Sequence, residues 1–229
     1  MAIQILKSGD RNYSDEGWLK TYQTFSHGPS HQGFRSLCAI NEDRIIPGVG
    51  FPLQTLREME MISIVIEGGL SHQDDNGNCT ILRPGQIQLI SAGTGITHSE
   101  LNASDKEEAH ILQIWILPIV RQLKSSYQEK SFPPSIYQNK WCLIISPDGR
   151  EGSLLIHQDV SLYLTDLDKD KELNKDLVAN CYGWIQVIKG EIEINGTLLE
   201  SGDGAAISEI TSLHIKAHSD SKLILFDLC

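Results

Sequence analysis

The sequence has neither a long apolar run nor a cluster of basic residues. No segment approaches the roughly 20 consecutive apolar residues that a membrane-spanning helix needs. The first residues, MAIQILKSGDRNYSDEG, do not contain the apolar core of a signal peptide. Lys and Arg total 19 against 30 Asp and Glu, for a formal net charge of -11. Because nucleic acids and anionic membranes are bound through clustered Lys and Arg, we expect neither as a partner.

Cysteine is scarce and follows no recognisable spacing. The chain has five, with no CxxC pair: Cys38, Cys79, Cys142, Cys181 and Cys229. An odd, scattered set predicts neither a disulfide framework nor a structural zinc site. We therefore expect reduced thiols in a cytoplasmic protein.

Long helical patterns are also rare, and the dominant pattern is that of β-strands. Gly, Asn, Asp and Pro separate short apolar runs such as MISIVIEG, QIQLISAG, WIQVIKGEIEI and SKLILFDL. Many short strands without intervening long helices indicate an all-β fold, a sandwich or a barrel. Helical candidates are few, and the better of two, residues 14–20 and 119–130, is the second.

Two parts of the chain resemble each other. Residues 64–86 and 184–204 both read as a strand, a Gly turn, a strand, an Asn-Gly turn, a strand and a Gly turn. The Asn-Gly pairs begin at Asn76 and Asn195, and each predicts a hairpin with a type I′ turn. This pattern is compatible either with two similar β-domains in tandem or with two ordinary hairpins that are alike by chance.

Proline and polar residues suggest where two such domains would be joined. Pro118, Pro133 and Pro134 punctuate a polar stretch. We expect an N-terminal domain at residues 1–120, a connecting segment at 121–140 and a C-terminal domain at 141–229.

Two stretches of the first half resemble the metal-binding motifs of cupins, a family of small jelly-roll barrels. The first motif has the form G-x5-H-x-H-x3-E-x6-G, and Gly48, Glu60 and Gly68 follow it with one extra residue before the last glycine. The second motif ends G-x2-H-x3-N, which Gly95 and His98 begin here. Asn102 completes it.

Longer stretches resemble one branch of that family, the pirin-like bicupins. INEDRIIPGVGF, SHQDDNGN, SAGTGITHSE and SPDGREGSLLIHQDVSLY occur in the family's order, within a region of similarity that spans roughly residues 24–165. The resemblance implies an all-β bicupin with two jelly-roll barrels in tandem. It also implies one divalent metal (Fe, Mn, Ni, Cu or Zn) held in the N-terminal barrel by an H-x-H pair and an H-x-E pair. Some members are quercetinases, which open a flavonol with dioxygen, and others are regulators that bind protein partners.

This sequence departs from the family at the first pair of ligands. His98 and Glu100 match the H-x-E pair, but Gln54 and Leu56 stand where the resemblance places the two histidines of H-x-H. A leucine cannot ligate, and a neutral amide oxygen is a poor replacement for imidazole on a transition metal. We expect metal binding to be weakened severely and no cofactor to be bound.

An altered ligand set is the alternative. Glu60 occupies the carboxylate position of the cupin motif, and a set of His98, Glu100, Glu60 and Gln54 could hold a single divalent metal. Glu100 would then be the candidate catalytic base for the flavonol hydroxyl. If no metal binds, Leu56 fills the barrel and His98 is hydrogen-bonded like any buried polar group.

Two functions follow from these alternatives. The first is a metal-free binding or regulatory protein, with a small aromatic ligand in the N-terminal barrel or a protein partner. The second is a metal-dependent dioxygenase of the quercetin 2,3-dioxygenase type. A third, an interaction module that uses the acidic surface, would require a basic partner.

Overall fold

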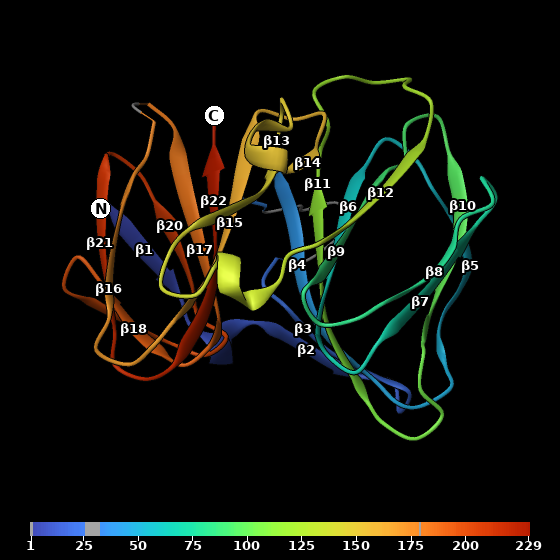
Figure 1. Ribbon diagram of the computed structural model, residues 1–229, viewed down its shortest axis with the longest axis horizontal. Helices are drawn as coiled ribbons and strands as arrows, with labels where there is room; N and C mark the ends of the chain where they lie inside the picture. The colour runs from blue at the N-terminus through green and yellow to red at the C-terminus, as the bar shows by residue number, and fades with distance from the viewer. Residues whose placement is uncertain (1, 26–32, 179) are drawn as a thin grey trace. The chain divides into compact units, whose positions relative to one another are not determined.

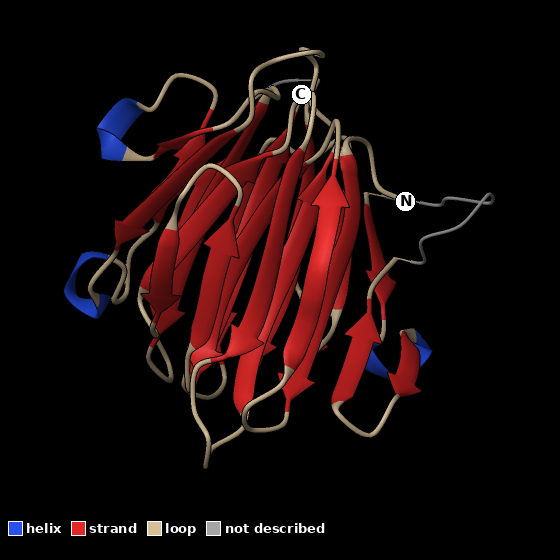
Figure 2. Cartoon of the chain, turned by 90° about the vertical axis from the view of Figure 1, so that its right-hand side faces the viewer, coloured by secondary structure: helices blue, strands red, loops and turns tan. Residues whose placement is uncertain are grey.

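The computed structural model describes residues 2–25, 33–178 and 180–229. Strands dominate this part of the chain, and the helices within it are short 3-10 turns (Figure 2). The all-β prediction is confirmed, whereas the helix expected within 119–130 is wrong. Ser126–Ser131 form strand β12, which pairs with β9 (Gln86–Ser91). No helix of the described residues is long and apolar enough to cross a membrane.

The chain divides into two compact units. The N-terminal unit comprises residues 12–132 and 156–158, and the C-terminal unit comprises residues 1–11, 133–155 and 159–229. The domain boundaries predicted from the sequence placed the first eleven residues in the N-terminal domain. In the structure β1 (Ile3–Leu6) instead pairs with β20 (Gly204–Ile207) of the C-terminal unit.

The N-terminal unit contains a seven-stranded sheet, in the order β12-β9-β6-β11-β4-β3-β2, and a four-stranded sheet, in the order β5-β10-β7-β8 (Figure 1). Every pairing in these sheets is antiparallel. The strands are β2 (Asn12–Asp15), β3 (Leu19–Gln23), β4 (Leu37–Ile45), β5 (Gly50–Leu56), β6 (Glu60–Glu67), β7 (Leu70–Asp74), β8 (Cys79–Leu82), β9 (Gln86–Ser91), β10 (Ile96–Asn102), β11 (Ala109–Ile116) and β12 (Ser126–Ser131).

The C-terminal unit repeats this arrangement with a seven-stranded sheet, β1-β20-β17-β22-β15-β13-β14, and a four-stranded sheet, β16-β21-β18-β19. Its elements are β1 (Ile3–Leu6), η1 (Ser8–Asp10), η2 (Pro134–Ile136), β13 (Cys142–Ser146), η3 (Arg150–Gly152), β14 (Leu154–Leu155), β15 (Val160–Leu167), β16 (Glu172–Asp176), β17 (Tyr182–Lys189), β18 (Glu191–Ile194), β19 (Thr197–Glu200), β20 (Gly204–Ile207), β21 (Ser212–Ala217) and β22 (Ser221–Leu228).

The internal repeat seen in the sequence corresponds to equivalent strands. Strands β6, β7, β8 and β9 cover the first copy, and β17, β18, β19 and β20 cover the second. In both copies the first and fourth strands pair in the large sheet, and the second and third pair in the small one. The similarity therefore reflects a repeated structure and not chance.

The two Asn-Gly turns differ. Asn195 and Gly196 have φ angles of 47° and 83°, as a type I′ turn requires. At the other pair only Gly77 has a positive φ, of 92°. There the Asp74 carboxylate accepts hydrogen bonds from the backbone N–H groups of Asn76 and Asn78, at 3.0 Å each. The side chain of Asp74 thus holds a wider turn than the dipeptide predicts.

The cysteine prediction is wrong for one pair. Cys181 and Cys229 form a disulfide, while Cys38, Cys79 and Cys142 are not disulfide-bonded. The two bonded residues are 48 positions apart, and sheet pairing, which the spacing of cysteines does not reveal, brings them together.

Candidate functional site in the N-terminal unit

The interior of the N-terminal unit contains a layer of polar side chains between two apolar clusters. On β6, Val65 belongs to one cluster and Met61 to the other, and Ser63 lies between them. On β11, Gln113 likewise lies between Ile111 and the tryptophan at 115. We call this set the polar layer: Asn41, Asp43, Gln54, Ser63, His72, Asp74, Gln88, His98, Glu100 and Gln113.

Strand register builds one half of the layer from the seven-stranded sheet. Asn41 is opposite Gln113, and Gln113 is opposite Ser63. Ser63 is in turn opposite Gln88 on β9. Because directly opposed residues point to the same face of a sheet, these four side chains form one row across four strands.

The four-stranded sheet supplies the other half. His98 on β10 is opposite Gln54 on β5 and opposite Asp74 on β7. Glu100, two residues along, is opposite His72. The H-x-E and H-x-D patterns of two neighbouring strands therefore place two imidazoles and two carboxylates on one inner face.

Glu100 is fully buried and accepts hydrogen bonds at both carboxylate oxygens. Gln88 Nε2 donates to Oε1 at 2.6 Å, and Ser63 Oγ lies 3.3 Å from the same oxygen. Gln113 Nε2 donates to Oε2 at 2.5 Å. The row on the seven-stranded sheet thus surrounds the carboxylate with donors, which is how a buried acid is accommodated.

His72 is fully buried between this carboxylate and Asp74. Its Nε2 lies 3.0 Å from Asp74 Oδ2, and its Nδ1 lies 3.8 Å from Glu100 Oε1. Burial lowers the pKa of His72, but the neighbouring carboxylates of Glu100 and Asp74 outweigh it and raise the pKa above the ordinary value. The ring stacks on Tyr127 with centroids 4.8 Å apart. His72 is therefore suited to carry a proton inside the unit.

His98 has the opposite environment. It is fully buried, and neither ring nitrogen has a hydrogen-bond partner. Burial lowers its pKa, the negative charge of Glu100 opposes this effect, and His72 adds to it. The expectation that His98 is hydrogen-bonded is thus wrong. A neutral imidazole with a free lone pair is available to a ligand.

Other atoms of the layer are unpartnered too. They are Oδ1 of Asn41, Oδ2 of Asp43, Oε1 of Gln88 and Nδ1 of His72, and the three oxygens are acceptors. Burial raises the pKa of Asp43 to about 6, against a hydrogen bond from Thr21 that lowers it. Buried polar atoms without partners are rare in folded proteins, and their concentration in one layer makes this layer a candidate binding site.

Gln54 and Leu56 lie where the sequence motif places them. Gln54 is half-buried opposite His98, and Leu56 is opposite Ile96. Leu56 packs in the apolar cluster with Met61, Ile90 and Ile96. Its side chain fills the unit with hydrocarbon at the position to which the resemblance assigns a histidine.

Glu60 is not brought to this site. It is on β6 three residues from Ser63, so the alternation of a strand points it to the opposite face of the sheet. Its carboxylate accepts a hydrogen bond from Ser91 Oγ at 2.7 Å and lies 3.2 Å from His157 Nδ1. The expectation that Glu60 joins His98 and Glu100 is corrected by this geometry.

The donors present do not fit the ligand set that the resemblance implies. Leu56 has no donor atom, and Gln54 offers an amide. Both oxygens of Glu100 already accept hydrogen bonds from amide groups, and the unpartnered ring nitrogens are the two of His98 and Nδ1 of His72.

Sequence reasoning found His98 and Glu100 but missed the residues that surround them. The two cupin motifs read from the sequence do not include His72, Gln88 or Gln113. The signal that could have found His72 is the alternation Leu70-Ser-His-Gln-Asp74, whose first, third and fifth residues are buried.

Comparison with known proteins identifies relatives across the chain. Residues 7–116 match the family described as Pirin, and residues 143–228 match the family described as Quercetinase C-terminal cupin domain. The quercetin 2,3-dioxygenase of Escherichia coli strain K12 is 40% identical over 230 residues, which cover 99% of this chain and 98% of that protein. A pirin-like protein of Caulobacter vibrioides is 32% identical over 219 residues, which cover 93% of this chain and 94% of that protein.

A solved structure of similar fold contains a metal. The bacterial pirin YhhW of Escherichia coli in complex with nickel(II) superposes with a TM-score of 0.93 at 40% identity. The match covers 99% of this chain and 98% of that one.

Proposed function

The chain belongs to the pirin family of bicupins, and from this premise we propose that its N-terminal unit binds a small polyhydroxylated aromatic molecule without a metal. In this proposal the chain is a binding or regulatory protein and not a dioxygenase. One observation carries the proposal, namely the set of buried acceptors without partners in the polar layer.

The chemistry of that set selects the ligand class. Asn41, Asp43 and Gln88 each present an unpartnered oxygen, and His98 presents two ring nitrogens of which one accepts. A ligand that satisfies them must donate several hydrogen bonds, as phenolic hydroxyl groups do. Met61 and Tyr127 of the adjoining apolar cluster offer hydrocarbon and an aromatic face to the rings of such a ligand.

The positions of Gln54 and Leu56 support the metal-free part of the proposal. Imidazole is the ligand that suits the transition metals of this family, and two imidazoles at these positions would complete a site with His98 and Glu100. The side chains present offer one weak donor and one hydrocarbon. Retained affinity for nickel is therefore expected to be low.

Binding of quercetin to chelator-treated protein tests this proposal. We expect quercetin to raise the melting temperature and to produce saturable heat in calorimetry, with no uptake of oxygen. Asn41→Leu removes one unpartnered acceptor and should weaken binding by about tenfold. Gln73→Ala, at an exposed position of β7, is the matched control and should bind like the wild type. Absence of saturable binding would overturn the proposal.

The second candidate is a dioxygenase with an altered ligand set, and His72 favours it. Its Nδ1 lies 3.8 Å from Glu100, and the rings of His72 and His98 have centroids 5.8 Å apart. Two histidines and one carboxylate are the donor set of many non-haem iron oxygenases. His72 would then replace Glu60 as a metal ligand. Glu100 would also be a metal ligand and would no longer act as the catalytic base. Oxygen uptake with quercetin that scales with retained metal, and metal retention lost in His72→Ala, would favour this candidate over the first.

The remaining expectations concern partners and location. A regulatory role would require a protein partner, and the net charge of -11 favours a basic one. A cytoplasmic location is part of the same proposal. Fractionation of cells that express the chain at native level tests the location, and salt-sensitive capture by a purified basic partner tests the interaction.

A further inference from the structure

Sheet register in the C-terminal unit brings together two sulfurs and a carboxylate. Cys181 directly precedes β17, and Cys229 directly follows β22. These strands are antiparallel with Tyr182 opposite Leu228, so the next pair outward is Cys181 and Cys229. Their Cα atoms are 4.5 Å apart, as in a closely spaced antiparallel pair, and their sulfurs are bonded. Asp227, two residues before Cys229, points to the same face.

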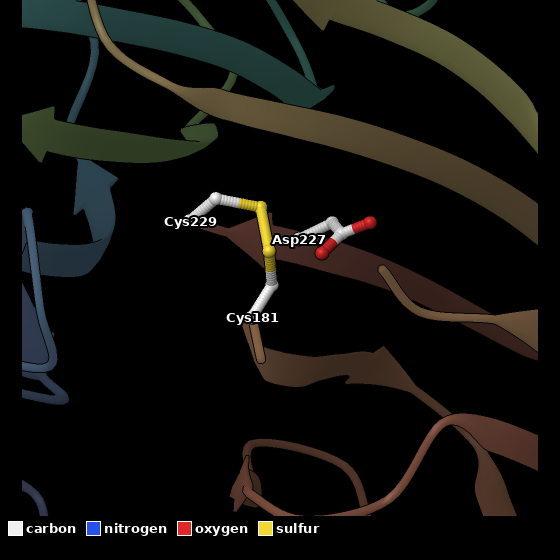
Figure 3. Close-up of side chains that lie close together, drawn as sticks. All are labelled: Cys181, Asp227 and Cys229. Carbon is white, nitrogen blue, oxygen red and sulfur yellow. A yellow bond between two sulfur atoms is a disulfide. The ribbon is translucent and has the colours of Figure 1, made fainter. Parts of the chain in front are cut away.

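The carboxylate has no structural partner for one of its oxygens. Asp227 is 6% exposed, and its Oδ1 has no hydrogen-bond partner. A carboxylate oxygen of Asp227 and both sulfurs lie within 4.8 Å of one another (Figure 3). Leu223 and Leu225, on the same face of β22, belong to the apolar core. The backbone N–H of Val178 donates to this carboxylate, which leaves Oδ1 as an unsatisfied buried acceptor at the end of the apolar row.

Solvent reaches this group of residues. Cys229 is exposed, and Cys181 lines a cavity of about 420 Å³ together with Val178, Tyr182 and Ile210. Reductants and ions can therefore approach the sulfurs without unfolding of the unit.

We propose that Cys181, Asp227 and Cys229 form a redox-gated site for a thiophilic divalent cation such as Zn²⁺. In the disulfide form the sulfurs are neutral and bonded to each other, and the site is closed to metal. In the reduced form two thiolates and one carboxylate supply three ligands, and water completes a tetrahedron. The site does not involve the N-terminal unit and does not depend on the function proposed for it.

The chemistry of opening the site is a thiol–disulfide exchange. A dithiol reductant gives two electrons and two protons to the Cys181–Cys229 bond, which breaks to leave two thiols, and the reductant becomes a disulfide. Zn²⁺ then replaces the two thiol protons, which are released to solvent. Oxidation of the pair by a disulfide reverses the sequence and releases the metal.

Zinc retention by the oxidised and reduced full-length chain tests the proposal. The protein is treated with chelator, incubated with Zn²⁺ with or without a phosphine reductant, desalted and analysed for zinc. We expect about one additional Zn²⁺ per chain in the reduced form. Co²⁺ in place of Zn²⁺ should give a sulfur-to-metal charge-transfer band, which the N-terminal unit cannot produce because its polar layer has no thiolate.

Variants separate this site from other thiols. Cys229→Ser should abolish the additional zinc and the cobalt band, and Asp227→Asn should lower the affinity by about tenfold or more. Cys79→Ser removes an exposed free thiol elsewhere and should change neither. Equal zinc retention in the oxidised and reduced forms would overturn the gating. A cobalt band that persists in Cys229→Ser would overturn the site.

Discussion

At the scale of single residues, the N-terminal unit is defined by polar groups in positions where hydrocarbon would be more stable. Glu100 is accommodated by three donors, but Asp43 is not, since its Oδ2 has no partner. Such groups cost free energy of folding, and proteins retain them where something binds. Asp43 makes this cost measurable.

The pKa of Asp43 predicts how stability varies with pH. An unfolded Asp titrates near 3.9, whereas burial raises the native pKa of Asp43 to about 6. Between these values the native state holds more protons than the unfolded state, so this group makes the free energy of unfolding fall as pH rises. Above about pH 6 the free energy of unfolding is lower by a constant amount, up to about 3 kcal/mol.

Asp43→Asn removes this titration and should raise the free energy of unfolding at pH 7.5 by up to about 3 kcal/mol. Urea denaturation from pH 4 to pH 7.5 measures the change. Asp105→Asn, at an exposed position, is the control and should leave the profile unaltered. A variant that is no more stable than the wild type at pH 7.5 would show that Asp43 is not a buried, unsatisfied acid.

At the scale of elements, the turns and the register between strands decide which side chains point into each unit. The turn between β18 and β19 depends on Gly196, whose φ of 83° an L side chain adopts only with strain. A Cβ at this position would meet no atom within 4 Å, so the cost of Gly196→Ala is purely that of the backbone. We expect a loss of about 1 kcal/mol in the free energy of unfolding.

Gly9→Ala is the matched control, because a Cβ there also meets no atom within 4 Å and its φ is not positive. That variant should be neutral or slightly stabilising. If thermal unfolding shows equal effects for the two variants, the turn between β18 and β19 is not of type I′.

The sequence predicted the elements well because β patterns and Gly turns are local. The repeat of residues 64–86 at 184–204 and the H-x-E pair of β10 were read correctly for that reason. The partners of Glu100 were not, since Gln88 and Gln113 reach it through register between strands far apart in sequence. Likewise, Glu60 matched a motif position. It is three residues from Ser63 on β6, so its side chain points to the opposite face of the sheet.

At the scale of the whole molecule, the disulfide closes a loop that contains β17 to β22. In the chain-entropy description a loop of 48 residues contributes up to about 4 kcal/mol. A phosphine reductant with a chelator should therefore lower the melting temperature, and added Zn²⁺ should restore part of the loss.

Cys79→Ser is the control for effects of reductant on free thiols and should lose stability on reduction as the wild type does. Thiol titration of the unreduced, denatured chain should find three free thiols, as the structure has. Five titratable thiols before reduction would contradict this account of the C-terminal unit.

The proposal for the N-terminal unit is that it retains no metal because Gln54 and Leu56 stand at two of the ligand positions. The most direct test is nickel retention after desalting, in non-reducing buffer so that Cys181 and Cys229 stay bonded. We expect far less than one Ni²⁺ per wild-type chain and about one in the variant that combines Gln54→His with Leu56→His. Near-stoichiometric nickel in the wild type that disappears in His98→Ala would contradict the claim.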